Sequence, residues 1–202
     1  MQANDSEQMA DEDGVEQLIG GLLRVLPHEL HHGRLDYIDE VPLAARLAAA
    51  LSARGCGAET TGISYPSGGR PDLRLRSSSN AAKPCCLTLE LKYFVLDWPT
   101  RGSKRWNGSI ARQHLGIEPG KPNNAVHDVV DKLPTTAVGT HVGLLLVKFA
   151  SPRSDGEDSI DEYIRSAGLS DAAWRCDRRD WVHPTDAGHH VDVYLWTRSR
   201  IG

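Results

Sequence analysis

The sequence has no apolar run long enough to cross a membrane. Of its 202 residues, 40% are apolar, which is ordinary for a soluble domain. No stretch approaches the ~18 to 20 apolar residues that a membrane-spanning helix needs. The first 16 residues have no Lys or Arg and no apolar centre, so they do not match a secretory signal peptide. We therefore expect a cytoplasmic protein with no membrane partner.

Cysteine is scarce, and its spacing is unlike that of metal sites or disulfide frameworks. The chain has four cysteines, at Cys56, Cys85, Cys86 and Cys176. None of them forms the C-x-x-C pair of a zinc knuckle. In the cytosol such residues are reduced thiols rather than disulfides. A disulfide-stabilised secreted domain and a structural zinc site are both disfavoured.

Basic residues are absent from the N-terminal segment, and this absence dominates the net charge. The formal net charge is −4, but residues 1–16 hold six acids and no Lys or Arg. The remainder has 23 basic and 21 acidic residues, so it is mildly basic and compatible with a nucleic-acid partner. We interpret residues 1–14 as an acidic, disordered tail and residues 15–202 as one domain.

The rest of the chain alternates between helical and strand patterns. The expected elements are a helix over 41–54, strands over 58–65, 72–76 and 85–96, a helix over 123–133 and a strand over 140–150. Gly55 is a stop for the first helix. Beyond this core of about 36–150, we expect a C-terminal helix and strand within 156–199, the helix near 159–167 and the strand from about 190 to 197. The predicted fold class is α/β, with a mixed central β-sheet flanked by helices in α-β-β-β-α-β order.

Three charged residues stand out in this pattern. Asp72 follows Pro71 at the start of one expected strand, and Glu90 and Lys92 lie inside the apolar run 87–96. Because a strand alternates its side chains, Glu90 and Lys92 emerge on the same face. Two opposite charges on one face of an apolar strand are costly to bury unless they are paired or hold a metal. This strand is therefore a candidate site.

The series Pro71-Asp72 followed by Glu90-Leu91-Lys92 resembles the signature of the PD-(D/E)xK nuclease superfamily, which has a restriction-endonuclease-like core. The resemblance covers residues 36–150 as an order of elements. It implies a hydrolase that cleaves DNA with Mg²⁺, or with Mn²⁺ in its place. Asp72, Glu90 and the backbone carbonyl of Leu91 would be the metal ligands. Lys92 would orient or deprotonate the attacking water, or neutralise the developing charge.

The same resemblance implies a DNA partner and a role in restriction, defence or repair. One site cuts one strand, so double-strand cleavage would need a homodimer or a partner subunit. Many members of the superfamily add an acid from the first helix, and Glu40 stands at the matching place, with Asp36 and Asp39 as competing choices. An acid at a helix start is also favoured by the helix dipole alone. Glu59 is a lesser candidate that we interpret as a surface residue.

A basic loop over 101–121 is the expected contact with nucleic acid. Its candidate DNA-binding residues are Arg101, Lys104, Arg105, Trp106 and Arg112. Basic side chains interleaved with an aromatic ring suit phosphate contacts and base stacking. The alternative interpretation is a solvated loop without a ligand. A second basic cluster, Arg175, Arg178 and Arg179, is expected on a surface helix or turn whose neighbouring tryptophans pack inward.

Two other classes of function are compatible with the sequence. Residues 28–32 match the H-E-x-x-H pattern of zinc metallopeptidases, with His28 and His32 as ligands and Glu29 as general base. However, Pro27 precedes the pattern, and we expect a short helix over 15–26 that ends there. The other class is a non-catalytic nucleic-acid-binding or assembly subunit with the same fold. A complete Asp, Glu and Lys set argues against it.

Overall fold

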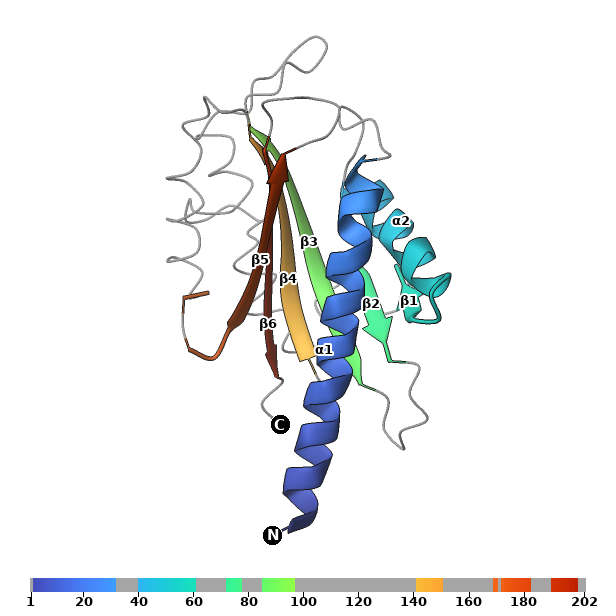
Figure 1. Cartoon of the computed structure of the whole chain (residues 1–202), viewed down its shortest axis with the longest axis vertical. Helices are drawn as coiled ribbons and strands as arrows, with labels where there is room; N and C mark the ends of the chain where they lie inside the picture. The colour runs from blue at the N-terminus through green and yellow to red at the C-terminus, as the bar shows by residue number, and fades with distance from the viewer. Residues whose placement is uncertain are drawn as a thin grey trace, which may run out of the picture.

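The protein contains a mixed β-sheet with two helices packed on one face, as Figure 1 shows. This computed structural model describes residues 2–31, 40–60, 72–77, 85–96, 141–150, 169–170, 172–182 and 190–199. The elements are α1 (Gln2–His31), α2 (Glu40–Ser52), β1 (Gly57–Glu59), β2 (Leu73–Arg76), β3 (Cys86–Leu96), β4 (His141–Ala150), β5 (Arg175–Val182) and β6 (His190–Ser199). The α/β class and the mixed sheet agree with the prediction. In the described ranges, neither helix combines the length and the apolarity needed to cross a membrane.

The six strands lie in the order β1-β2-β3-β4-β6-β5. The first three form an antiparallel meander, β4 runs parallel to β3, and β6 is antiparallel to both β4 and β5. Parallel strands cannot be joined by a tight turn and need a crossover connection. The helix expected in this connection, over 123–133, lies outside the described residues, as does the helix expected over 159–167.

Helix α2 matches the predicted helix over 41–54 to within two residues. Leu43, Leu47 and Leu51 recur at helical spacing and are fully buried. Gly55 follows the helix with a φ of 81°, a left-handed conformation that glycine adopts without steric cost. The Cys56 N–H donates to the carbonyl oxygen of Leu51 at 3.1 Å, which satisfies one of the last helical carbonyls.

Helix α1 is longer than the sequence predicts. It includes most of the segment 1–14 that was interpreted as a disordered tail, and it continues through Pro27 to His31. The prediction that the helix ends at Pro27 is wrong. Leu30, beyond the proline, is fully buried, so packing of the last turn offsets the hydrogen bond that Pro27 cannot donate.

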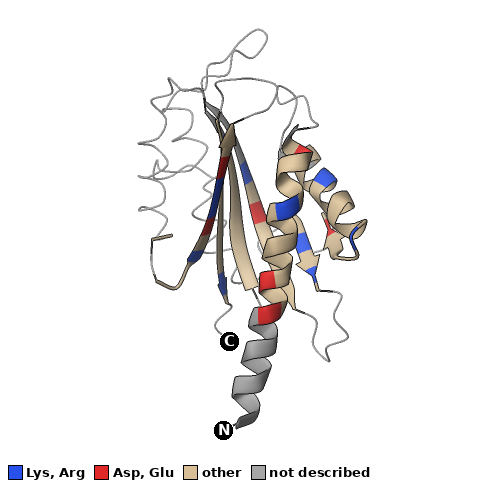
Figure 2. Cartoon of the chain, viewed as in Figure 1, with Lys and Arg blue, Asp and Glu red and all other residues tan. Residues whose placement is uncertain are grey.

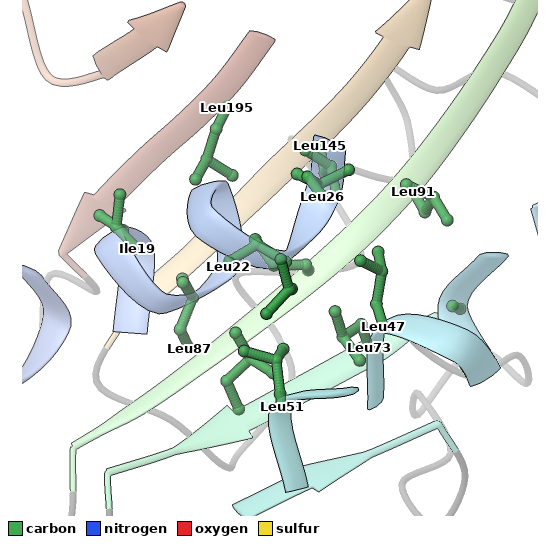
Figure 3. Packing of buried hydrophobic residues seen from close by; sticks show 14 of the residues in the cluster. Ile19, Leu22, Leu26, Leu47, Leu51, Leu73, Leu87, Leu91, Leu145 and Leu195 are labelled. Atoms are coloured by element: carbon green, nitrogen blue, oxygen red, sulfur yellow. The ribbon is translucent and has the colours of Figure 1, made fainter. Parts of the chain in front are cut away.

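The hydrophobic core lies between the helices and one face of the sheet, as Figure 3 shows. The helices contribute Ile19, Leu22 and Leu26 from α1 and Leu47 and Leu51 from α2. They pack on Leu73, Leu87, Leu91, Leu145 and Leu195 of four strands. Each fully buried leucine stabilises the fold by about 1.5 to 3 kcal/mol relative to an exposed one.

The opposite face of the sheet, here called the far face, carries buried polar side chains. Residues adjacent in sequence to the core leucines point away from the helices, because strand side chains alternate. The buried polar residues at these positions are Arg74, Thr88, Glu90, Lys148 and Asp192. Charged groups are rarely buried without a partner or a function, so the far face is where a site is expected.

The segment Arg175–Val182 forms an edge strand, so the prediction of a surface helix or turn is wrong. It pairs with β6 along its length, and Figure 2 shows charged residues distributed along it. An edge strand has a neighbour on one side only, and charges there oppose pairing with a second chain. Trp181 is half-buried against the core, which agrees with the inward packing expected of it.

Candidate active site

The antiparallel pair β2–β3 brings Asp72 to the middle of β3. Leu73 pairs with Leu89, so Asp72, one residue before β2, lies next to Glu90. The backbone N–H of Leu91 donates a hydrogen bond to Oδ2 of Asp72 at 2.7 Å. A backbone N–H in a sheet needs an acceptor. The Asp72 carboxylate provides it at the point where β2 begins.

Glu90 and Lys92 lie on the far face of β3 together with Asp72. Leu89 and Leu91 belong to the core beneath the helices, so the residues between and after them point the other way. Glu90 is only 6% exposed, whereas Asp72 and Lys92 are half-buried. The predicted alternation of this strand is found in the structure, and solvent reaches the group through Asp72 and Lys92.

The backbone of Leu91 adds an oxygen to this group. In an antiparallel ladder, the N–H and C=O of one residue point to the same neighbouring strand. The Leu91 carbonyl therefore points to the side on which its N–H meets Asp72. Two carboxylates and a carbonyl are hard oxygen ligands of the kind that Mg²⁺ binds, with water completing the coordination.

Asp72 can accept the hydrogen bond and still ligate a cation, because a carboxylate offers about four lone-pair sites. In the described part of the chain, no group of three or more His, Cys, Asp and Glu side chains could hold a metal ion. A metal site here would therefore depend on Asp72 and Glu90 with the Leu91 carbonyl. The donor set fits a weakly held Mg²⁺ ion rather than a closed zinc site.

Several predicted site residues stay predictions. Glu40 is the first residue of α2, but its side chain is not among those that the structure describes. Outside the described residues lie Asp36, Asp39 and all five candidate DNA-binding residues, Arg101, Lys104, Arg105, Trp106 and Arg112. Glu59 has a side chain that is 45% exposed and pairs with Arg76 at 3.3 Å, in agreement with its interpretation as a surface residue.

Part of the H-E-x-x-H pattern lies in the last turns of α1. Nε of Arg46 on α2 lies 3.2 Å from Oε2 of Glu29, and the Arg46 guanidinium also donates to the Glu29 carbonyl oxygen. Glu29 thus links the two helices, which is a structural role. The His28 side chain is 61% exposed. The His31 side chain and all of His32 are outside what the structure describes.

The structure also reveals an ionic group that sequence reasoning missed. Nζ of Lys148 lies 3.6 Å from Oδ2 of Asp192, and both side chains are less than a tenth exposed. Nη2 of Arg178 lies 3.4 Å from the other Asp192 oxygen. Lys148 and Asp192 face each other in the β4–β6 register. That register joins segments about 40 residues apart, so no local pattern indicates the pair.

The cysteines do not form a second site. None of the four forms a disulfide, and burial raises the pKa of Cys56 and of Cys176 above the ordinary thiol value. Sγ of Cys85 lies 4.0 Å from Nδ1 of His141, whose Nε2 is 3.2 Å from the Ser199 hydroxyl oxygen. Cys85 and His141 are 3% and 5% exposed, so this pair belongs to the packed interior of the sheet.

Comparisons of the chain with protein-family models, with curated proteins and with solved structures found no match in any of the three. A function therefore has to be inferred from the geometry of these residues.

Proposed function

We propose that this protein is a Mg²⁺-dependent nuclease that hydrolyses phosphodiester bonds in DNA. The proposal is carried by the contact of Asp72 with the Leu91 N–H, which sets Asp72 beside Glu90 on the face that also carries Lys92. This supports the grouping that the PD-(D/E)xK signature implies. The β1-β2-β3 meander followed by a parallel β4 is compatible with a restriction-endonuclease-like core, which is the fold that we propose.

Asp72, Glu90 and the Leu91 carbonyl would hold Mg²⁺, or Mn²⁺ in its place. When bound, the cation supplies positive charge to the phosphate and activates a water molecule. The hydrogen bond from Leu91 orients the Asp72 carboxylate in advance. Burial of Glu90 in the sheet limits the movement of its carboxylate. Lys92 orients or deprotonates the attacking water, or neutralises the charge that develops on the phosphate.

The substrate is DNA, and the loop over 101–121 is the proposed contact for its phosphates and bases. Double-strand cleavage would proceed through a homodimer or a partner subunit, because one site cuts one strand. The proposed setting is cytoplasmic, in restriction, defence or repair. These assignments follow from the resemblance of residues 71–72 and 90–92 and from the mildly basic body of the chain.

Cleavage of plasmid, linear and single-stranded DNA by the Asp72→Asn variant tests the proposal. Asparagine keeps an oxygen that accepts the Leu91 hydrogen bond but removes the negative charge. Asp72→Asn is therefore expected to fold normally and to lose Mg²⁺-dependent cleavage by about a hundredfold or more. EDTA should abolish cleavage by the wild type, and Mn²⁺ should restore it.

Two further variants separate loss of charge from loss of structure. Asp72→Ala also removes the hydrogen-bond acceptor, so the free energy of unfolding is expected to fall by about 1 to 3 kcal/mol. Asp177→Asn changes another half-buried aspartate, in β5 at the opposite edge of the sheet, and should leave cleavage unchanged. Full cleavage by Asp72→Asn would contradict the assignment. DNA binding without any cleavage would favour the non-catalytic subunit.

A further inference from the structure

Arg74 is a buried cation without an anionic partner in the described part of the chain. It lies in the middle of β2 and is 8% exposed. Its Nη2 reaches Sγ of Cys86 at 3.8 Å, which is a weak contact, and its buried Nε has no hydrogen-bond partner. Among the described residues, no carboxylate lies within ion-pair distance of its guanidinium.

Such an arrangement is costly, and arginine cannot relieve it by losing a proton. The guanidinium of arginine keeps its charge in proteins, and removing an unpaired charge from water is unfavourable. Glu59 stands opposite Arg74 in the β1–β2 register, yet its carboxylate pairs with Arg76. Among the described residues, Arg74 therefore has no counterion, because the acid nearest in register pairs with Arg76 instead. An external anion would supply one.

The position of Arg74 relates this anion to the candidate active site. Arg74 follows Asp72 by two residues on the same face, which corresponds to about 7 Å along the strand. Across the β2–β3 register it pairs with Thr88, between Cys86 and Glu90. Because the guanidinium contacts Cys86, it lies on the side of Thr88 away from Glu90. Its anion would thus lie near the Asp72–Glu90 pair without occupying it.

We propose that Arg74 binds a backbone phosphate of the nucleic acid that flanks the phosphate being cleaved. The planar guanidinium fork matches the geometry of phosphate oxygens, which it can bind with two hydrogen bonds. The inference rests on the proposed nuclease function for the identity of the anion. It adds a binding residue that acts on the substrate outside the reacting centre.

Thermal unfolding with inorganic phosphate, in EDTA, tests the anion site without any catalysis. Phosphate is expected to raise the Tm of the wild type more than chloride does at equal ionic strength. Arg74→Met should lose this additional shift. Arg76→Met is the matched control, because Arg76 lies on the same strand and the same face but is 42% exposed and paired with Glu59. It should keep the shift.

Binding of a short DNA oligonucleotide, also in EDTA, tests the substrate. Arg74→Met is expected to weaken binding roughly tenfold to hundredfold, which is the loss of a charged hydrogen-bonded contact, whereas Arg76→Met should change it little. If Arg74→Met does not fold, Arg74→Lys serves in its place. Lysine keeps the charge without the fork, so several-fold weaker binding is expected.

The outcomes separate this inference from the proposed function. If phosphate and DNA bind the Arg74 variants as they bind the wild type, the phosphate site is refuted, even when cleavage depends on Asp72. If the phosphate response disappears with Arg74 but no DNA is cleaved under any condition, the anion site stands and the nuclease proposal fails. A specific role for Arg74 would also be refuted if Arg76→Met, like Arg74→Met, lost both the phosphate-induced rise in Tm and the binding of DNA.

Discussion

Lys148 and Asp192 face each other on two central strands and form an ion pair that is almost fully buried. Burying two charges costs desolvation energy that their attraction offsets only when both remain. Arg178 adds a second, more exposed contact to Asp192. Removing the charge of Lys148 or of Asp192 alone should therefore destabilise the protein more than removing both charges together.

Lys148→Met is expected to lower the free energy of unfolding by about 3 kcal/mol, because it leaves Asp192 buried with one exposed partner. Adding Asp192→Leu should recover most of the loss. Urea unfolding measures both effects. Asp177→Asn, which removes the more exposed pair with Arg175 at 3.1 Å, is the control and should change stability by less than about 1 kcal/mol. An unaffected Lys148→Met variant would show that the buried pair contributes little.

The positions of some site residues in the fold can be predicted from the sequence, whereas those of others cannot. Glu90 and Lys92 could be predicted to share a face, because they are charged residues at alternate positions of an apolar run. The polar character of Arg74 is also visible in the alternation of residues 72–76. The sequence does not reveal that Arg74 is buried, nor that no described carboxylate pairs with it. Both depend on which strands flank β2 and on where Glu59 directs its carboxylate.

Two glycines show how tightly particular elements approach each other. In β4, a Cβ on Gly143 would lie 2.4 Å from the carbonyl oxygen of Trp196 and 2.9 Å from Cδ2 of Leu89. In α1, a Cβ on Gly20 would meet no atom within 4 Å. The first glycine is required by packing, whereas the second only lowers helix propensity.

Gly143→Ala is expected to lower the free energy of unfolding by about 1 to 3 kcal/mol, because the carbonyl oxygen of a neighbouring strand cannot move aside without disturbing the sheet. Gly20→Ala is the matched control and is expected to raise it by about 0.5 to 1 kcal/mol. Chemical denaturation of the two variants under identical conditions provides the comparison. Equal effects of the two substitutions would contradict the close approach of β4 and β6.

Elements with a clear period were predicted, and those shaped by their neighbours were not. Helix α2, strand β3 and strand β4 follow from spacing and apolar runs, and their observed bounds agree with the expected ranges to within two residues. Strand β5 has no apolar alternation, because it is an exposed edge stabilised by pairing with β6. The last turn of α1 continues past Pro27 because Leu30 packs in the core.

At the scale of the whole molecule, one hydrophobic cluster joins both helices to the sheet. It includes residues from α1, α2 and strands β2, β3, β4 and β6. Leu22 lies on the helix side of the sheet, whereas Trp196 is buried at an alternate position of β6 that points to the far face. If the helix layer and the far face unfold together, a substitution at Leu22 must also shift the unfolding transition that Trp196 reports.

Leu22→Ala is expected to lower the free energy of unfolding by about 2 to 5 kcal/mol. The midpoints measured by far-ultraviolet circular dichroism and by tryptophan fluorescence should decrease together, since two-state unfolding gives coincident transitions. A change in circular dichroism alone would mean that α1 unfolds separately. The prediction of one domain over 15–202 would then be wrong.

The local features of this protein follow from its amino-acid sequence. Backbone geometry alone determines periodicity, so the helical spacing of α2, the buried run of β4 and the shared face of Glu90 and Lys92 could be predicted before any contact was known. Which of these residues come into contact depends instead on how the strands and helices pack. The bond between Asp72 and Leu91, the Lys148–Asp192 pair and the lack of a carboxylate partner for Arg74 among the described residues all depend on strand register. Register is selected by burial across the whole sheet, because a shift of one residue would exchange its two faces.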